Sequence, residues 1–163
     1  AMLEELVTEF APIADHADVH IVFTPAANDV LITRADAGKI RQMFSNLIDN
    51  TIKYNVKGGG VSIAVRRIPG GAGDAILAYF TDTGIGIRAE DLDRIFEKFG
   101  RGEGVSKVYT EGSGLGLYVA REILRRHNGR IWGESAGVGK GATFSVELPI
   151  TAGSGDDTTA QVA

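Results

Sequence analysis

The chain has 163 residues, of which 44% are hydrophobic and 23% are charged, values that are typical of one folded globular domain. It contains no cysteine, which excludes disulfides and thiol chemistry, and three scattered histidines are a poor basis for a zinc site. A net charge of −4 argues against a nucleic-acid partner. Without a signal-like segment or an apolar run long enough to span a bilayer, we expect a cytoplasmic domain with no membrane contact, leaving open an anchor elsewhere in a longer protein.

The first part of the chain predicts two helices with two strands between them. Apolar residues at helical spacing indicate a short amphipathic helix over residues 3–13. The β-rich runs 19–23 and 29–33 are separated by a short proline-containing stretch, a pattern that predicts a hairpin. From residue 36 to residue 55 the apolar positions follow the period of a helix, with Asp36 as the expected N-cap.

The second part of the chain predicts strands joined by tight turns, with helices between them. The expected elements are strands at 61–68 and 75–81, a short helix at 88–96, a mobile loop at 100–112, a helix at 115–127, and strands at 130–135 and 142–148. This pattern favours an α+β fold, a two-layer α/β sandwich with a mixed, mostly antiparallel sheet covered on one face by helices. Residues 1–150 are expected to form this domain, and the small polar residues 151–163 a flexible C-terminal tail.

A stripe of polar side chains runs along the predicted helix at 36–55. Asn46, Asn50 and Lys53 are spaced at i, i+4 and i+7, which places them on one face at the edge of the apolar surface, and Tyr54 borders them. Asparagines on a helix are most often ordinary solvated residues. Two of them lower the helix propensity, however, and their amide oxygens are suitable ligands for a Mg²⁺ ion that keeps most of its waters.

Two clusters among the 22 glycines resemble ligand-binding loops. Asp82 ends a predicted strand, and Gly84 and Gly86 after it would let the backbone approach a flat ligand while the carboxylate accepts a hydrogen bond from an exocyclic amine. A plain Asp-Gly turn is the ordinary alternative. The cluster at 112–117 opens the helix at 115–127, where free N–H groups favour an anion such as phosphate. It lacks the ending of a Walker loop, and no parallel βαβ unit is predicted around it.

The order of these motifs is more specific than any one of them. The segments NLIDNTIKY (46–54), DTGIG (82–86), IFEKF (95–99) and GSGLGL (112–117) resemble the N, G1, F and G2 boxes of sensor histidine kinases. The resemblance covers roughly residues 3–150 and implies the Bergerat ATP-binding fold, which these kinases share with gyrase and MutL. It also implies the catalytic ATP-binding domain of a two-component kinase, which transfers the γ-phosphoryl of Mg-ATP to a histidine on a separate dimerisation and phosphoacceptor domain. A response regulator would act downstream.

The resemblance implies a role for individual residues. Asn50 would coordinate Mg²⁺, and Asn46 would support the phosphates. Asp82 would bind the adenine amine, with Thr143 in the last strand backing it through water. The remaining residues implied to contact the nucleotide lie around the base, the ribose and the phosphates: Lys53, Tyr54, Gly84, Gly86, Ile87, Lys98, Arg101, Ser113, Gly114, Leu115, Gly116 and Leu117.

Two residues, Arg101 and Lys98, are candidates for the cation that contacts the γ-phosphate. Arg101 resembles the lid arginine of the family, and Lys98 stands in the F box where an arginine is more frequent. A lysine there would lack the bidentate fork of a guanidinium. Arg101, together with Asn46 and Lys53, forms the set implied to act in the transfer itself.

The phosphoacceptor is expected outside this chain. The family's acceptor is a histidine followed by Glu or Asp, and His16, His20 and His127 each lack that context. We expect His16 in a loop, His20 in a strand and His127 near a helix C-terminus. An ATPase of the same superfamily, or an anti-sigma serine kinase, is an alternative, but both would carry a glutamate base where Asn46 stands. A nucleotide-binding module without transfer is the third possibility, and the intact motifs weigh against it.

Overall fold

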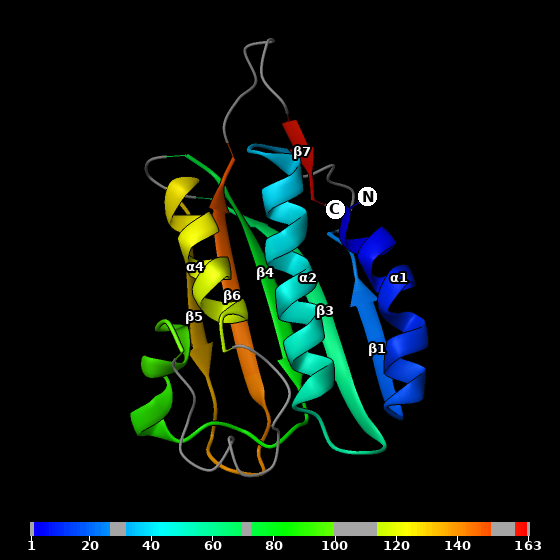
Figure 1. Ribbon diagram of the computed structural model, residues 1–163. Coiled ribbons are helices and arrows are strands. Elements are labelled where there is room, and N and C mark those ends of the chain that lie inside the picture. The colour runs from blue at the N-terminus through cyan, green and yellow to red at the C-terminus, as the bar shows by residue number, and fades with distance from the viewer. Residues whose placement is uncertain (1, 27–31, 70–72, 100–113, 151–158, 163) are drawn as a thin grey trace.

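The computed structural model describes residues 2–26, 32–69, 73–99, 114–150 and 159–162 (Figure 1). It has two layers, because α1 (Met2–His16), α2 (Ala37–Lys53) and α4 (Gly116–Arg126) all lie on one face of a sheet (Figure 1). This arrangement confirms the expected two-layer sandwich. Within the described residues, no helix is both long enough and apolar enough to cross a membrane.

The main sheet has five strands in the order β1-β3-β4-β6-β5. Its strands are β1 (Val19–Thr24), β3 (Gly59–Ile68), β4 (Ala75–Asp82), β5 (Arg130–Glu134) and β6 (Ala142–Pro149). The β1–β3 pair is parallel and the other pairs are antiparallel, so the sheet is mixed and mostly antiparallel, as expected. A second, two-stranded sheet joins β2 (Ile32–Arg34) to β7 (Thr159–Gln161).

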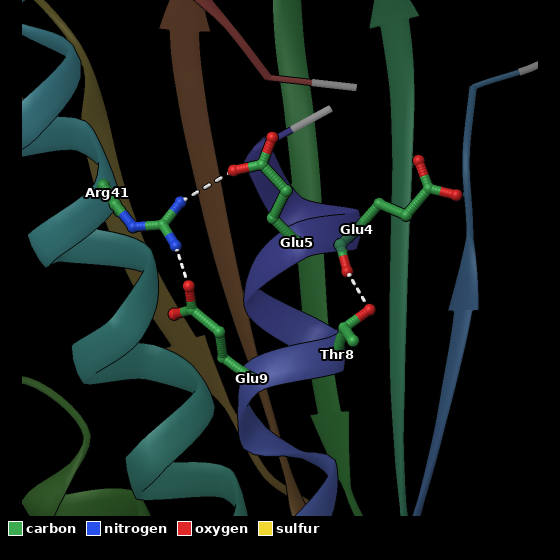
Figure 2. Close-up of polar contacts among 5 residues, drawn as sticks. All are labelled: Glu4, Glu5, Thr8, Glu9 and Arg41. Atoms are coloured by element: carbon green, nitrogen blue, oxygen red, sulfur yellow. Dashed lines mark hydrogen bonds and ion pairs between the residues drawn. The ribbon is translucent and has the colours of Figure 1, made fainter.

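Helix α2 forms where the sequence predicts it. The Asp36 carboxylate caps its first turn by accepting a hydrogen bond from the Lys39 N–H at 3.0 Å. Its apolar face is buried against the sheet, where the rings of Phe44 and Phe80 lie 5.7 Å apart. On its solvent side, Arg41 forms ion pairs with Glu5 and Glu9 of α1, so the two helices are linked at the surface (Figure 2).

The register of β4 and β6 decides which side chains face the helices. Cross-strand partners in an antiparallel pair point to the same face, and successive residues point to opposite faces. Phe80 faces α2, so Asp82 and its partner Ala142 also lie on the helix side. Thr81 and its partner Thr143 therefore lie on the opposite face, where their hydroxyls are 3.1 Å apart.

The predicted hairpin between residues 19–23 and 29–33 is wrong. Strand β1 pairs in parallel with β3, and β2 pairs with β7 near the other end of the chain. A parallel partner requires a long crossover, and α2 lies between β1 and β3 in the sequence. The pairing buries Val19 and places Ile21 and Phe23 against the core.

Three smaller expectations also differ from the structure. The helix expected at 88–96 is instead two short 3₁₀ turns, Ala89–Asp91 and Arg94–Phe96, and His16 ends α1 and does not lie in a loop. Residues 159–162, expected in a flexible tail, include β7 and the fully buried Val162. Val162 is held because its carbonyl accepts a hydrogen bond from the Leu3 N–H at 3.3 Å and its side chain joins the core. The mobile loop expected at 100–112 lies outside the described residues.

Candidate functional site

The polar stripe of α2 lies against the beginning of α4. The Asn46 side-chain amide donates a hydrogen bond to the Gly116 carbonyl at 3.3 Å. A Cβ atom placed on Gly116 would lie 3.5 Å from the Asn50 side-chain nitrogen. The first turn of α4 therefore packs close to both asparagines.

The N-terminus of α4 has the character of an anion site. Leu115 occupies the N-cap position and supplies no side-chain cap, so the first N–H groups of the helix have no side-chain acceptor there. Gly114 just before it has a φ of +67°, which a residue with a side chain rarely adopts. Free N–H groups and the helix dipole favour a negative charge such as a phosphate. Together with the asparagines of α2, they give one end of the site both metal-ligand and phosphate-binding character.

Asp82 is a buried carboxylate at the end of β4, 7% exposed. Its Oδ1 accepts hydrogen bonds from the backbone N–H groups of Gly84, at 2.8 Å, and Ala142, at 3.2 Å. Burial raises the pKa of this carboxyl above its ordinary value, and the two hydrogen bonds offset part of that rise. Among the described residues no group donates to Oδ2, so this oxygen can accept a hydrogen bond from a ligand.

The loop after Asp82 is fastened to the end of α2. The Ile85 N–H donates to the Tyr54 carbonyl at 3.0 Å. A Cβ atom on Gly84 would lie 2.1 Å from the same carbonyl oxygen, so only glycine fits there. The helix that carries Asn46 and Asn50 thus also positions the loop that follows Asp82.

A second glycine-rich segment, the β5–β6 turn at 135–141, supports the same loop and was not predicted as part of the site. The Gly139 and Gly141 N–H groups donate to the carbonyls of Ile85, at 2.6 Å, and Gly84, at 3.1 Å. Gly86 has a φ of +68°, and a Cβ atom on it would lie 2.0 Å from the Gly137 carbonyl oxygen. The alternation of glycines at 137, 139 and 141 directly before β6 was the available sequence signal.

Among the described residues, Thr143 makes no direct hydrogen bond to Asp82. The two side chains leave opposite faces of the sheet, and the Thr143 hydroxyl lies 3.1 Å from that of Thr81. Asp82, Thr81, Thr143 and Lys140 all line one cavity of about 250 Å³, so the water-mediated support of Asp82 by Thr143 stays a prediction. The residue of β6 that lies opposite Asp82 is Ala142, which offers only its backbone N–H.

The three cationic side chains predicted to meet the phosphates, Lys53, Lys98 and Arg101, are not all placed beside the asparagines. The Lys53 ammonium lies 5.9 Å from the centre of the Tyr54 ring, next to the asparagine stripe. The Lys98 side chain is exposed, and its ammonium lies 5.5 Å from the centre of the Phe99 ring. Among the described residues, it makes no hydrogen bond or ion pair with the asparagines or with Asp82. Arg101 and Ser113 lie outside the described residues. Leu117 and Ile87 are partly buried against the core, at the start of α4 and after the Asp82 loop.

The donor atoms suit Mg²⁺ better than a transition metal. Within the described residues, no group of three or more His, Asp or Glu side chains could hold a metal ion, and the chain has no cysteine. Magnesium bound together with a nucleotide uses one or two protein oxygens, and phosphates and waters complete its shell. The amide oxygen of Asn50, beside the anion site of α4, fits this requirement.

Residues 35–152 match the family described as histidine kinase-, DNA gyrase B- and HSP90-like ATPases. The chain belongs to this family. It is 35% identical over 150 residues to the sensor-like histidine kinase SenX3 of Mycobacterium tuberculosis, covering 91% of this chain and 34% of that protein. The catalytic domain of histidine kinase ThkA has the same fold, with a TM-score of 0.76, 25% identity and 93% of each chain covered. Full-length ShkA, solved with AMPPNP, gives a TM-score of 0.76 at 27% identity, with 93% of this chain and 30% of that chain covered.

The family assignment confirms the resemblance found in the sequence and the ATP-binding fold that it implies. This histidine kinase-like ATPase domain spans about a third of the length of SenX3. The four motifs that carry the resemblance come together in part here, at the Asn46–Gly116 contact and at the Tyr54–Ile85 contact.

Proposed function

We propose that this domain binds Mg-ATP and transfers the γ-phosphoryl group to a histidine on a separate dimerisation and phosphoacceptor domain. The observation that carries the proposal is that one helix, α2, reaches both halves of the site. Asn46 and Asn50 contact the start of α4, and Tyr54, at the end of the same helix, holds the loop that follows Asp82. A nucleotide bound across this helix would have its base at Asp82 and its phosphates at α4.

The base is bound at Asp82. Two backbone N–H groups occupy Oδ1 and fix the carboxylate, so Oδ2 accepts a hydrogen bond from the exocyclic amine of adenine. Gly84 and Gly86 keep the loop thin enough for a flat ring to approach the backbone. Ile87 adds apolar surface next to them.

The phosphates are bound at α4. The N–H groups from Gly114 to Leu117 bind phosphate oxygens, and Lys53 adds a positive charge from α2. Asn50 would hold a magnesium ion with Asn46 beside it, and such an ion supplies positive charge that neutralises the phosphate oxygens. Arg101 or Lys98 supplies the cation for the γ-phosphate. The transfer thus depends on positioning and charge neutralisation by this chain.

The acceptor is a histidine of another domain. His16 ends α1, His20 lies in β1 and His127 caps the C-terminus of α4. None of these positions is at the junction of Asn50 with Gly116. Relatives named sensor histidine kinases support an acceptor domain elsewhere in a longer protein and a response regulator as the downstream partner.

Labelled phosphate tests the proposal. The chain is incubated with Mg-ATP and a helical dimerisation domain that carries an acceptor histidine, and acid-labile label on that domain is measured. We expect transfer by the parent chain and none by Asn50→Ala, while thermal melting without ligand stays unchanged. Gln42→Ala removes an exposed amide from the same helix and should keep full transfer. Transfer by Asn50→Ala would refute the metal role, and failure of the parent chain would refute the proposed function.

A further inference from the structure

The hydroxyl of Ser135 forms hydrogen bonds to two separate segments, the loop after Asp82 and the 135–141 turn. Ser135 follows β5 directly, and its Oγ donates to the Gly141 carbonyl at 2.6 Å. The same oxygen accepts hydrogen bonds from the backbone N–H groups of Ile87, at 3.0 Å, and Gly137, at 3.2 Å. The Gly137 carbonyl, at 3.3 Å, is a second and longer acceptor for the Ser135 proton. A serine hydroxyl has one donor and two acceptor sites, so all three are occupied.

The segments that Ser135 joins are the two that hold Asp82. Ile87 belongs to the loop whose Gly84 N–H donates to Asp82 Oδ1. Gly141 directly precedes Ala142, whose N–H donates to the same oxygen. The position of this carboxylate therefore depends on the relative position of two segments that come from different parts of the chain.

Other contacts between these segments are made by the backbone alone. The Gly139 and Gly141 N–H groups donate to the carbonyls of Ile85 and Gly84. Ser135 is the side chain that links the 135–141 turn to the Asp82 loop by a hydrogen bond among the described residues. A change at Ser135 thus alters the link and leaves the backbone contacts in place.

We propose that Ser135 is a positioning residue that fixes the Asp82 carboxylate and thereby sets the selectivity for adenine over guanine. The inference rests on the proposed function, because it assumes that a purine binds at Asp82. Adenine offers an amine donor to Oδ2, whereas guanine carries a carbonyl oxygen at the equivalent ring position, which a carboxylate repels. Discrimination of this kind requires the carboxylate to stay in one place, since a mobile carboxylate can turn away from the wrong base.

Calorimetric titration of this chain with Mg-ATP and with Mg-GTP measures that selectivity. We expect Ser135→Ala to weaken ATP binding by about tenfold, because the loss of one or two hydrogen bonds would leave the Asp82 carboxylate less firmly positioned. GTP binding should change much less. The ratio of the two affinities should therefore fall by about tenfold. Ser145→Ala is the matched control: Ser145 is fully buried in β6, but no described residue is a hydrogen-bond partner of its hydroxyl, so the ratio should not change.

A double variant separates positioning from a general loss of structure. If Ser135 acts through Asp82, adding Ser135→Ala to Asp82→Asn should cause no further loss of ATP affinity. Should Ser135→Ala fail to fold, Ser135→Cys keeps nearly the same size with a much weaker hydrogen-bonding group, and it should also lower the ratio.

An unchanged ATP-to-GTP ratio in a folded Ser135 variant overturns the inference while leaving ATP binding by the parent, and with it the proposed function, intact. A further loss of affinity in the double variant also overturns it. If the parent chain binds neither nucleotide, the proposed function fails and the inference fails with it.

Discussion

The His127 imidazole joins the C-terminal end of α4 to the N-terminal end of α2. Its Nε2 accepts a hydrogen bond from the Asp36 N–H at 3.2 Å, and its Nδ1 lies 2.7 Å from the Ile123 carbonyl oxygen. Because Nε2 is the acceptor, the proton of the neutral ring must be on Nδ1, which donates to Ile123. The Asn46–Gly116 contact fastens the opposite end of α4, so the two helices are held together at both ends of α4.

The first prediction concerns this link. His127→Ala should lower the free energy of unfolding by about 1–2 kcal/mol, because it leaves the Asp36 N–H and the Ile123 carbonyl without this partner. His127→Gln keeps one donor and one acceptor and should recover part of the loss. Denaturant unfolding measures both, and His20→Ala, an exposed position in β1, serves as the control. Equal stability of His127→Ala and the parent chain would show that the two hydrogen bonds contribute nothing.

The second prediction follows from the raised pKa of Asp82. Because the folded state holds the proton more tightly than the unfolded state, the folded chain is favoured at low pH and loses stability as pH rises from the ordinary carboxyl pKa through the raised one. Each unit of pKa shift corresponds to about 1.4 kcal/mol. Asp82→Asn removes this charge, so the ligand-free variant should be as stable as the parent chain or more stable at neutral pH, with the difference shrinking in acid. A variant that is clearly less stable at neutral pH would contradict the stated cause of the shift.

Much of the site could be predicted from the sequence because its motifs are local. Helix α2 with its Asp36 cap, and the stripe of Asn46 and Asn50, follow from spacing along one helix. The glycines at 84 and 86 are where a backbone carbonyl comes too close for a side chain. These features depend on residues near one another in the chain, and the structure places them as expected.

The remaining features depend on pairing between distant segments. Strand β1 pairs with β3, and β2 pairs with β7. The residues of β1 and β2 alone do not indicate which strand each of them pairs with. Thr143 illustrates how sensitive a sheet is to register: a shift of one residue moves a side chain to the other face, so Thr143 faces Thr81 while Ala142 lies opposite Asp82. The role of Ser135 depends on a turn that closes onto a loop from another part of the chain.

The third prediction concerns the contact between α1 and α2. Arg41 bridges Glu5 and Glu9, whose side chains are 64% and 58% exposed (Figure 2). Ion pairs in water contribute little, so Arg41→Ala should lower the free energy of unfolding by less than about 1 kcal/mol, and high salt should lessen the difference. Nucleotide affinity should not change. A loss well above that value, measured by denaturant unfolding in high salt, would mean that Arg41 stabilises the fold by packing and not by charge.

The fourth prediction is that the purified chain hydrolyses ATP slowly. Attack by water requires a residue that orients and deprotonates it, and an asparagine at position 46 cannot accept that proton. The Asn46 amide also donates to the Gly116 carbonyl, which gives it a role in holding α4. Steady-state phosphate release should therefore be slow, and His16, His20 and His127 should carry no acid-labile label. Rapid release that is lost in Asn46→Ala would favour the ATPase alternative.

Calorimetric titration of Mg-ATP into the parent chain and into Asp82→Asn tests most directly the claim that this site binds adenine at Asp82. The substitution replaces an acceptor oxygen with an amide that can turn a donor toward the adenine amine, a mismatch of about 1–3 kcal/mol. We expect ATP affinity to fall by about tenfold or more, with Asp49→Asn, an exposed position on α2, binding as the parent does. Equal ATP affinity of Asp82→Asn and the parent chain would remove Asp82 from the site and contradict the account.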